Sequence, residues 1–198
     1  ATSGAPSSSW APSNKAAPSG AASRAEWLNN RGDAGSTSYS PLAQITSTNF
    51  NALEVAWRFK TDSLGPRPEY KLEGTPLMVN GVLYTTAGTR RAVVALDAVT
   101  GELRWVHAEY EGARAAASPR QLSGRGVAYW TDGRDERILY ITTGYRLVAL
   151  DARTGARIAS FGADGIVDLK AGVVFGKGQQ IDLAIERSAD GPSYVLKA

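Results

Sequence analysis

Few side chains in this sequence have the chemistry to act on a substrate. The sequence has no cysteine, which excludes disulfides, thiolate metal sites and cysteine nucleophiles. Its one histidine, His107, lies two residues after Trp105, and because no partners for a catalytic triad can be identified we interpret it as structural or solvated. Glu73 and Arg125 lie in the glycine-containing segments LEGTPL and SGRGVAYW. On residue type alone they are a loop carboxylate and a surface ion-pair partner.

Two further groups of charged residues could bind ligands. Arg90 and Arg91, in the segment AGTRRAV, could line the mouth of a cofactor site or cap a loop. We favour the loop, because charge pairs usually face water. Asp132, Asp135 and Glu136 suggest a calcium loop, but the spacing of an EF-hand is absent. We therefore predict a solvated hairpin tip there, and no metal site.

The composition excludes several classes of protein. The chain of 198 residues is 43% hydrophobic and 21% charged, which is typical of an ordinary folded domain and excludes disorder over the whole length. No run approaches the ~18 consecutive apolar residues of a membrane-spanning helix. The net charge is +3, with basic and acidic residues interspersed, so we predict no nucleic-acid partner.

The elements that must position these side chains are predicted to be β-strands. Leu53, Val55, Trp57 and Phe59 alternate with polar or small residues, which is the period of a half-buried strand. Asn80-Gly81 separates two apolar runs and predicts a tight hairpin between 77–79 and 82–86. Further strands are predicted over residues 92–96, 103–106, 127–130, 138–142, 147–150 and 157–161. No segment between residues 70 and 162 sustains a helical period.

An internal repeat organises these strands. The segment LYTTAG at 83–88 recurs as LYITTG at 139–144, and VVALDAVTGELRW at 93–105 recurs as LVALDARTGARIASF at 147–161. Asp97 and Asp151 can each accept backbone N–H bonds across a Thr-Gly turn. Trp105 ends the first unit with a large ring suited to packing between neighbouring sheets, where the second unit has Phe161. A repeat with about four strands is the size of one β-propeller blade.

The repeat resembles the tryptophan-docking signature of quinoprotein dehydrogenases, which use pyrroloquinoline quinone (PQQ) in an eight-bladed β-propeller. Four further segments are similar to the same family: WLNNRGDAGSTSYSPLAQIT at 27–46, LEVAWRF at 53–59, the region 65–98 and SGRGVAYW at 123–130. The resemblance is closest to the glucose-dehydrogenase-like branch and covers residues 26–170. It implies an all-β fold of about two to three four-stranded antiparallel blades, which is a partial β-propeller.

The resemblance assigns two residues to the cofactor site. Glu73 matches an acidic residue beside the quinone at the inner start of the first full blade, and Arg125 matches an arginine that contacts the quinone oxygens and carboxylates. A planar guanidinium suits such oxygens and would stabilise negative charge that develops on a quinone. The alcohol-oxidising branch has a vicinal cysteine pair where this chain has Ala117-Ser118-Pro119-Arg120, which favours the glucose-type branch.

The resemblance also limits what this chain can do. In the family, the calcium ligands, the proton-abstracting aspartate and the tryptophan beneath the quinone lie in later blades, so we predict no catalytic or metal-binding residues here. PQQ and calcium are expected in the complete enzyme. We do not expect this chain alone to bind PQQ or to be active, because a hydride-transfer site needs cofactor, metal and base together.

The predicted function is therefore the N-terminal portion of a PQQ-dependent dehydrogenase. With the remaining blades or a partner chain, it would oxidise a sugar or alcohol and pass electrons to a quinone acceptor. The alternative is a non-catalytic scaffold that binds proteins through open strand edges.

The parts of the chain outside the repeat carry less information. Residues 1–25 hold eight Ala, seven Ser, three Pro and two Gly, which predicts a flexible leader. Residues 171–198 have no assignment. Family members work outside the bacterial cytoplasm, and the leader fits an exported N-terminus whose signal peptide has been removed, so we expect a periplasmic or otherwise exported protein.

Overall fold

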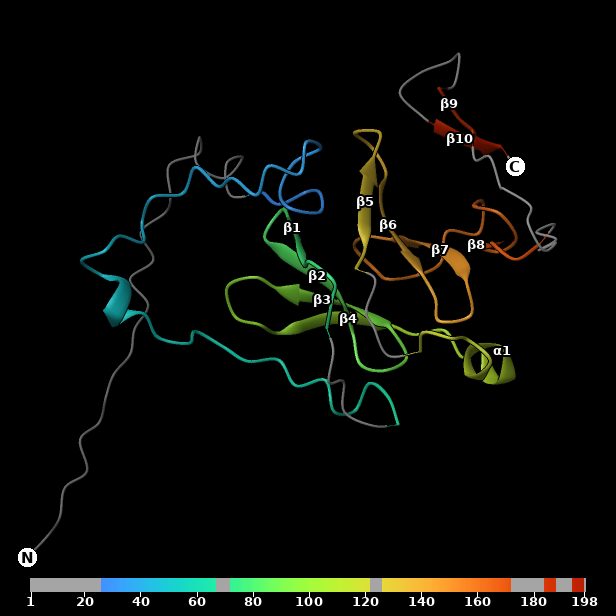
Figure 1. Cartoon of the computed structure of the whole chain (residues 1–198), viewed down its shortest axis with the longest axis horizontal. Helices are drawn as coiled ribbons and strands as arrows, with labels where there is room; N and C mark the ends of the chain where they lie inside the picture. The colour runs from blue at the N-terminus through green and yellow to red at the C-terminus, as the bar shows by residue number, and fades with distance from the viewer. Residues whose placement is uncertain (1–25, 67–71, 122–125, 172–183, 188–193, 198) are drawn as a thin grey trace, which may run out of the picture. The chain divides into compact units, whose positions relative to one another are not determined.

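The computed structural model describes residues 26–66, 72–121, 126–171, 184–187 and 194–197 (Figure 1). The predicted leader, residues 1–25, lies outside the described residues. The chain forms two compact units, one ending at Asp168 and the other running from Leu169 to Ala198. In the described part of the chain no helix combines the length and apolar character needed to cross a membrane.

The first sheet is a four-stranded antiparallel meander with the order β1-β2-β3-β4. Its strands are β1 (Leu77–Val79), β2 (Val82–Ala87), β3 (Ala92–Asp97) and β4 (Leu103–His107). The predicted hairpin is confirmed, because Val79 pairs with Val82 and both turn residues, Asn80 and Gly81, have positive φ. That backbone shape is the two-residue turn for which Asn-Gly is preferred.

The second sheet repeats the meander with the order β5-β6-β7-β8 (Figure 1). Its strands are β5 (Ala128–Thr131), β6 (Glu136–Ile141), β7 (Arg146–Asp151) and β8 (Ile166–Asp168). The predicted strand at 157–161 is wrong. Arg157 makes one isolated bridge to Leu150, and the Phe161 N–H then donates to the Ile158 carbonyl, so the chain turns away from the ladder. The fourth strand forms five residues later, at Ile166.

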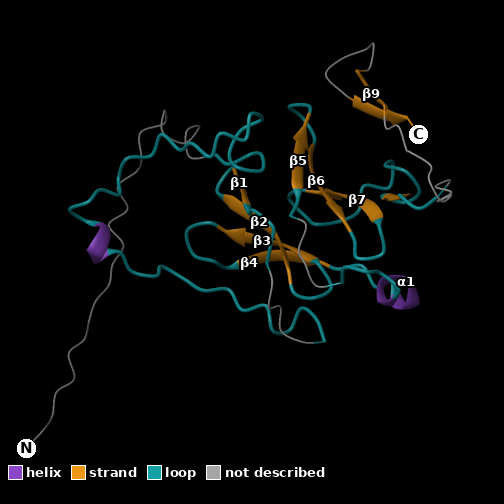
Figure 2. Cartoon of the chain, viewed as in Figure 1, coloured by secondary structure: helices purple, strands orange, loops and turns teal. Residues whose placement is uncertain are grey.

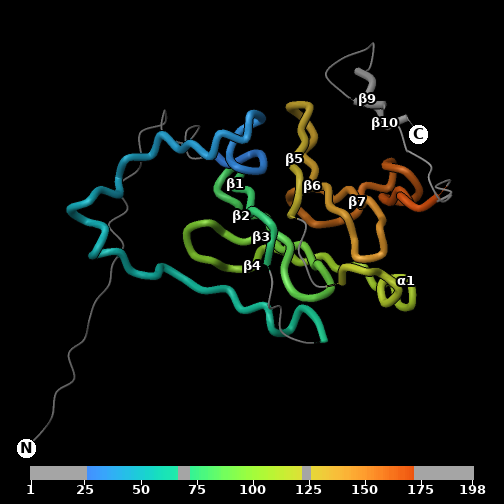
Figure 3. Tube along the Cα trace, viewed as in Figure 1, coloured from blue at the N-terminus to red at the C-terminus, as the bar shows by residue number. Residues whose placement is uncertain are grey.

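The predicted strand at 53–59 is also wrong. The segment is extended but pairs with no strand in the described chain, and Leu53 and Val55 are exposed. Figure 2 shows the helical elements: the 3-10 helix η2 (Phe50–Ala52) before this segment, and α1 (Gly112–Ala116), which follows β4 and precedes β5 in the chain. The trace in Figure 3 follows the connection from β4 past α1 toward β5.

The first sheet is buried on both faces at β3, although β4 is largely exposed. Val93 and Ala95 point to one face and pack with residues of the second sheet, such as Ile138 and Leu150. Val94 and Leu96 point to the other face, where Trp57, Phe59 and Leu64 cover them. This alternation is the two-residue period of a strand, and it makes β3 the centre of the described fold.

Tryptophan docking joins the layers at two places. Trp105 of β4 donates its indole N–H to the Ala152 carbonyl at 3.0 Å, and Trp57 donates to the Ala98 carbonyl at 3.2 Å. Each ring lies against a glycine of a Thr-Gly turn, so that a Cβ at Gly155 or Gly101 would come within 2.5 Å of the ring. The extended segment at 53–59 therefore docks on the first sheet as β4 docks on the second.

The turns that receive these rings are held by the repeated aspartates. The Asp97 carboxylate accepts the backbone N–H groups of Val99 and Thr100, and Asp151 accepts those of Arg153 and Thr154. This is the bonding predicted for both positions. The second unit contains a separate antiparallel hairpin of β9 (Ala184–Arg187) and β10 (Tyr194–Lys197).

Candidate functional site

One edge of the two sheets gathers the loops that carry the candidate residues. Because β1 and β2 pair with Leu77 opposite Tyr84, residues 73–76 lie beside the loop 88–91 that follows β2. β4 ends at the same edge, since His107 pairs with Val93 at the start of β3. In the second sheet, residues 126–127 and the loop 142–145 occupy the corresponding positions. We call this the loop edge; the Thr-Gly turns lie at the opposite edge.

Glu73 lies at the loop edge, next to a close contact between two backbones. A Cβ at Gly74 would lie 2.8 Å from the Gly126 nitrogen and 2.9 Å from its Cα. Only a residue without a side chain allows this approach. The residue that follows Glu73 and the residue that follows Arg125 are thus brought together. Glu73 itself is exposed, whereas Arg125 lies outside the described residues, so its role stays a prediction.

A buried hydroxyl lies beside the same contact. Thr86 is 1% exposed, and its Oγ1 has no hydrogen-bond partner among the described residues. This oxygen lies 3.4 Å from the position that a Gly74 Cβ would occupy. A buried hydroxyl without a hydrogen-bond partner lowers the stability of the fold, and a polar ligand could supply the missing partner. A glycine cradle, an exposed carboxylate and an unpaired hydroxyl fit a polar planar cofactor such as the expected PQQ.

The two neighbouring arginines have different surroundings. Arg91 is buried and caps two carbonyl groups, donating to Thr142 at 3.2 Å and to Arg120 at 2.5 Å. Arg90 is exposed and lies over the Tyr110 ring, 5.4 Å from its centroid. The predicted loop-capping role is therefore found at Arg91, whereas Arg90 lines a pocket.

A network around Glu111 fixes the connection between the sheets. The Glu111 side chain is 2% exposed and accepts bonds from Thr142 Oγ1 at 2.9 Å and the Gly144 N–H at 2.6 Å. Arg114 donates to the Gly144 carbonyl and pairs through both terminal nitrogens with Asp168, which raises the pKa of Arg114. No local pattern indicates this network beyond the charged residues themselves, because its partners lie up to 54 residues apart.

The remaining candidates have structural roles. His107 Nε2 lies 2.9 Å from Glu109 Oε1, and the histidine ring packs edge-on against Tyr140. Burial, followed by the charges of Glu109 and Glu111, raises the pKa of Tyr140. The acidic cluster is a hairpin tip, as predicted, in which Asp132 accepts the backbone N–H groups of Arg134 and Asp135. Within the described ranges no three His, Cys, Asp or Glu residues are grouped to hold a metal ion.

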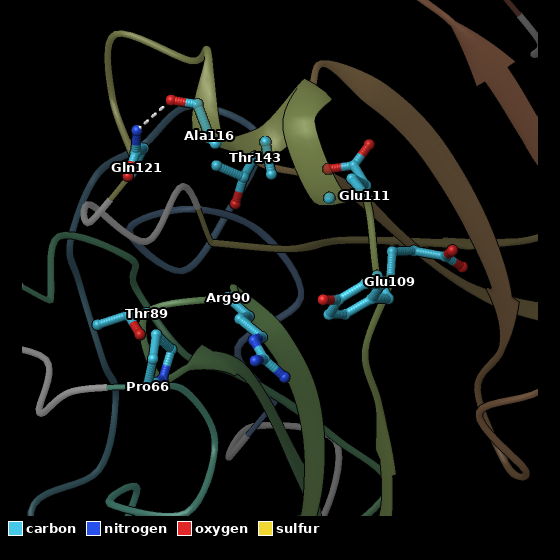
Figure 4. Close-up of a pocket in the computed structure, with 11 residues that line it drawn as sticks. Pro66, Thr89, Arg90, Glu109, Glu111, Ala116, Gln121 and Thr143 are labelled. Atoms are coloured by element: carbon cyan, nitrogen blue, oxygen red, sulfur yellow. Dashed lines mark hydrogen bonds between the residues drawn. The ribbon is translucent and has the colours of Figure 1, made fainter.

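A pocket of about 190 Å³ opens at the loop edge (Figure 4). Four segments line it: residue Pro66, the loop at Thr89 and Arg90, the connection from Glu109 to Gln121, and Thr143 after β6. In Figure 4, Thr89 and Arg90 lie on one side, and Thr143, Ala116 and Gln121 on the other. No pattern in the sequence predicted this pocket, because its walls come from loops of both sheets.

The fold and the site define this part of the chain as consecutive β-propeller blades joined by docked tryptophans. The family model described as "PQQ: Glucose/ethanol/alcohol dehydrogenase, beta-propeller domain" matches residues 27–189. The chain therefore belongs to the PQQ dehydrogenase β-propeller family, and the predicted family and partial propeller fold are confirmed.

Named relatives agree with this assignment. The chain is 36% identical over 136 residues to the dehydrogenase subunit of a quinone alcohol dehydrogenase from Gluconobacter oxydans, covering 68% of this chain and 17% of that protein. It is 33% identical over 164 residues to a glycerol dehydrogenase large subunit from Gluconobacter thailandicus, covering 76% of this chain and 21% of the relative. The chain thus spans about a fifth of the length of these relatives.

Solved structures show the same fold. A quinohemoprotein alcohol dehydrogenase from Pseudomonas putida superposes with a TM-score of 0.62 at 33% identity, covering 74% of this chain and 19% of that one. A europium-containing methanol dehydrogenase superposes with a TM-score of 0.56 at 28% identity, covering 67% of this chain and 22% of that one. The two sheets described here are thus similar to one part of a larger propeller.

Proposed function

We propose that the protein containing this chain is a PQQ-dependent dehydrogenase of an alcohol or a sugar, and that this chain presents Glu73 and Arg125 to the cofactor. The contact between Gly74 and Gly126 carries the proposal, because it brings together the two segments that bear these residues. Family membership supports the cofactor, and the names of the relatives support an alcohol as substrate.

Each residue has a definite task in this proposal. Bound PQQ supplies a two-electron acceptor for the hydrogen on the substrate carbon. Arg125 holds the anionic edge of the cofactor by directed, charge-assisted hydrogen bonds. Glu73 accepts a hydrogen bond from a polar group of the cofactor and so orients it. The Thr86 hydroxyl, which has no partner among the described residues, forms a hydrogen bond to the cofactor. Gly74 keeps the floor between these groups free of side chains.

Other parts of the proposed reaction depend on residues beyond the described ones. We propose that calcium binds to other blades of the complete protein, because the described residues do not group three metal ligands. A quinone as electron acceptor and a periplasmic location follow from the resemblance to the family. The segment Ala117–Arg120 supports a glucose-type rather than a disulfide-dependent site.

The test compares charge-neutral variants in the full-length protein. Glu73→Gln and Arg125→Gln should each weaken PQQ binding by about tenfold to a hundredfold, the range of a hydrogen bond to a charged group. Equilibrium dialysis measures that affinity, and PQQ-dependent dye reduction measures the activity. Glu102→Gln and Arg134→Gln are matched controls, because both are exposed residues in turns at the opposite edge. Equal PQQ affinity in the test and control variants would refute the proposal.

A further inference from the structure

A second pocket lies between the two sheets, at the edge opposite to the loop edge. We call this the turn edge, because the Asn80-Gly81 hairpin and the Thr-Gly turns lie there. The pocket has a volume of about 230 Å³, and residues of both sheets line it. No residue of the glycine contact or of the loop after β6 lines it, so it is separate from the candidate cofactor site.

The inner wall of this pocket is apolar. Val79, Val82 and Tyr84 are no more than 7% exposed, and the half-buried ring of Trp105 lies beside them. Both rings use their polar atoms within the protein, since Tyr84 Oη and Trp105 Nε1 donate to the Ala152 carbonyl. The apolar side chain of a ligand would therefore leave water and pack against this wall.

The polar groups of the lining fall on two sides. Asn80, in the β1-β2 hairpin, donates through Nδ2 to Glu136 Oε1 at 3.0 Å. Arg104 lies on β4, at the other end of the first sheet. Arg153 follows Ala152, which accepts the indole of β4. One side of the pocket thus carries an amide and a carboxylate, and the other carries two guanidinium groups.

Both sides retain unused bonding capacity. Glu136 accepts the bonds of Asn80 and Tyr129 on one oxygen, Oε1, and its Oε2 has no donor within the described residues. Arg153 donates through its backbone N–H to Asp151, but its guanidinium forms no hydrogen bond or ion pair in the described part of the chain. An acceptor for a cationic group and a donor for an anionic group are therefore both open to a ligand.

These features together select a ligand that carries both charges and an apolar group. A carboxylate suits the planar guanidinium of Arg153, and an ammonium group suits Glu136 Oε2. A ligand with only one charge would leave the opposite side of the pocket without a partner. An apolar cavity of about 150 Å³ accepts benzene. A pocket of about 230 Å³ thus has room for a branched or aromatic side chain.

We propose that this pocket binds a free apolar α-amino acid as its zwitterion, with the ammonium group on Glu136 and the carboxylate on Arg153. Binding is reversible and involves no bond rearrangement. It does not require PQQ, so the proposal stands or falls separately from the proposed function.

An NMR titration of the full-length protein without PQQ tests the site, with L-leucine as the probe. Two analogues each lack one charged group: 4-methylpentanoate lacks the ammonium group and 3-methylbutylamine lacks the carboxylate. Each should bind about tenfold more weakly than leucine, which is the range of a hydrogen bond to a charged group. Equal affinities for leucine and both analogues would refute the assignment of a zwitterion.

Variants then assign each charge to its residue. Arg153→Gln should weaken leucine binding by about tenfold but change the affinity for 3-methylbutylamine little, because that analogue has no carboxylate. Glu136→Gln should weaken leucine binding and change the affinity for 4-methylpentanoate little. Arg134→Gln is the matched control, since Arg134 is an exposed arginine of the β5-β6 turn that does not line the pocket.

Two further measurements separate lost binding from misfolding and from loss of the cofactor site. Arg153→Gln should not lower the melting temperature of the ligand-free protein, because the guanidinium has no protein partner in the described residues. Glu73→Gln should leave leucine binding unchanged even where it weakens PQQ binding. The proposal is wrong if leucine does not bind, or if Arg153→Gln binds leucine as the unchanged protein does.

Discussion

At the scale of single residues, Asp97 both accepts backbone N–H groups of its turn and pairs with Arg104, and both interactions lower its pKa. The Arg104 guanidinium at 2.8 Å, and then the backbone N–H groups of Thr100 and Val99, lower the pKa of Asp97 from 3.8 to about 2. A carboxylate whose folded-state pKa lies below its unfolded value stabilises the fold above the unfolded pKa. That stabilisation is lost as the pH falls from about 4 toward 2.

Asp97→Asn tests this pH dependence. The variant should unfold at a lower urea concentration than the unchanged protein near neutral pH, and the gap between their midpoints should shrink as the pH falls from about 4 to 2. When Asp97→Asn is compared with its parent in an Arg104→Gln background, the difference between their midpoints near neutral pH should be smaller, because Arg104 is the largest cause of the lowered pKa of Asp97. A gap that stays constant over this interval would show that Asp97 is not the titrating group.

Two aromatic side chains share one acceptor. Tyr84 Oη and Trp105 Nε1 both donate to the Ala152 carbonyl, each at 3.0 Å. Burial, and then the charge of Glu136, raises the pKa of Tyr84 to about 12, so its hydroxyl keeps the proton that it donates. Either donor alone still satisfies the carbonyl.

A double-mutant cycle measures this redundancy. Tyr84→Phe and Trp105→Phe each remove one donor, and together they leave a buried carbonyl without either bond. The double variant should therefore lose about 1 kcal/mol more free energy of unfolding than the sum of the single variants. Urea denaturation gives all four values. Strict additivity would mean that the two bonds act independently.

At the scale of elements, the docking of tryptophan on glycine holds the layers together. Gly155, with φ of 71°, leaves room for the Trp105 ring, and Gly101, with φ of 74°, leaves room for Trp57. Gly81 has the same φ of 74°, but a Cβ there would meet nothing within 4 Å. The three glycines thus separate the cost of backbone strain from the cost of a steric clash.

Alanine at these positions should therefore give two different results. Gly81→Ala carries the strain of positive φ alone, whereas Gly155→Ala and Gly101→Ala also push a large ring out of its place. We expect the latter two to lower the free energy of unfolding by about 1–3 kcal/mol more than Gly81→Ala, as overpacking does. Denaturant titration measures the difference. Equal losses at all three positions would mean that the docking contacts do not stabilise the fold.

The elements also show which structure local sequence could predict. The strands of both meanders, the Asn80-Gly81 hairpin and the aspartate-held turns follow from alternation and turn residues within a few positions. The strand expected at 157–161 failed because a turn at Phe161 interrupts the ladder. The segment 53–59 has the right alternation, but a strand also needs a partner, and local pattern carries no information about distant partners.

The candidate site was predictable only in part. Glu73 was identified through resemblance, and the close approach of its neighbour Gly74 to Gly126 is a contact across more than 50 residues. Two features could not be predicted: the burial of Glu111, and the Thr143 hydroxyl, which has no hydrogen-bond partner among the described residues. Both depend on contacts between loops that are far apart in the sequence. Charged and hydroxyl residues are usually solvated, so their types alone give no signal.

At the scale of the whole molecule, the two four-stranded sheets form two neighbouring blades, and a closed propeller needs at least about four. This chain by itself should therefore give no dye reduction with PQQ, calcium and an alcohol or sugar. The full-length protein should be active under the same conditions. Activity in the chain alone, or its absence from a full-length protein that binds PQQ, would contradict the proposed division of the site among blades.

The loop edge and the opposite edge, at the two ends of the strands, carry different kinds of contact, and this affects how such a protein can evolve. The tryptophan docks and the aspartate-held turns lie at one edge, and the loops with the glycine contact and the pocket of Figure 4 lie at the other. Substitutions in the loops that change ligand specificity can thus accumulate without disturbing the tryptophan contacts between the layers. Such a scaffold can evolve new specificity without losing stability, because the loops that recognise ligands and the contacts that stabilise the fold lie at opposite ends of the strands.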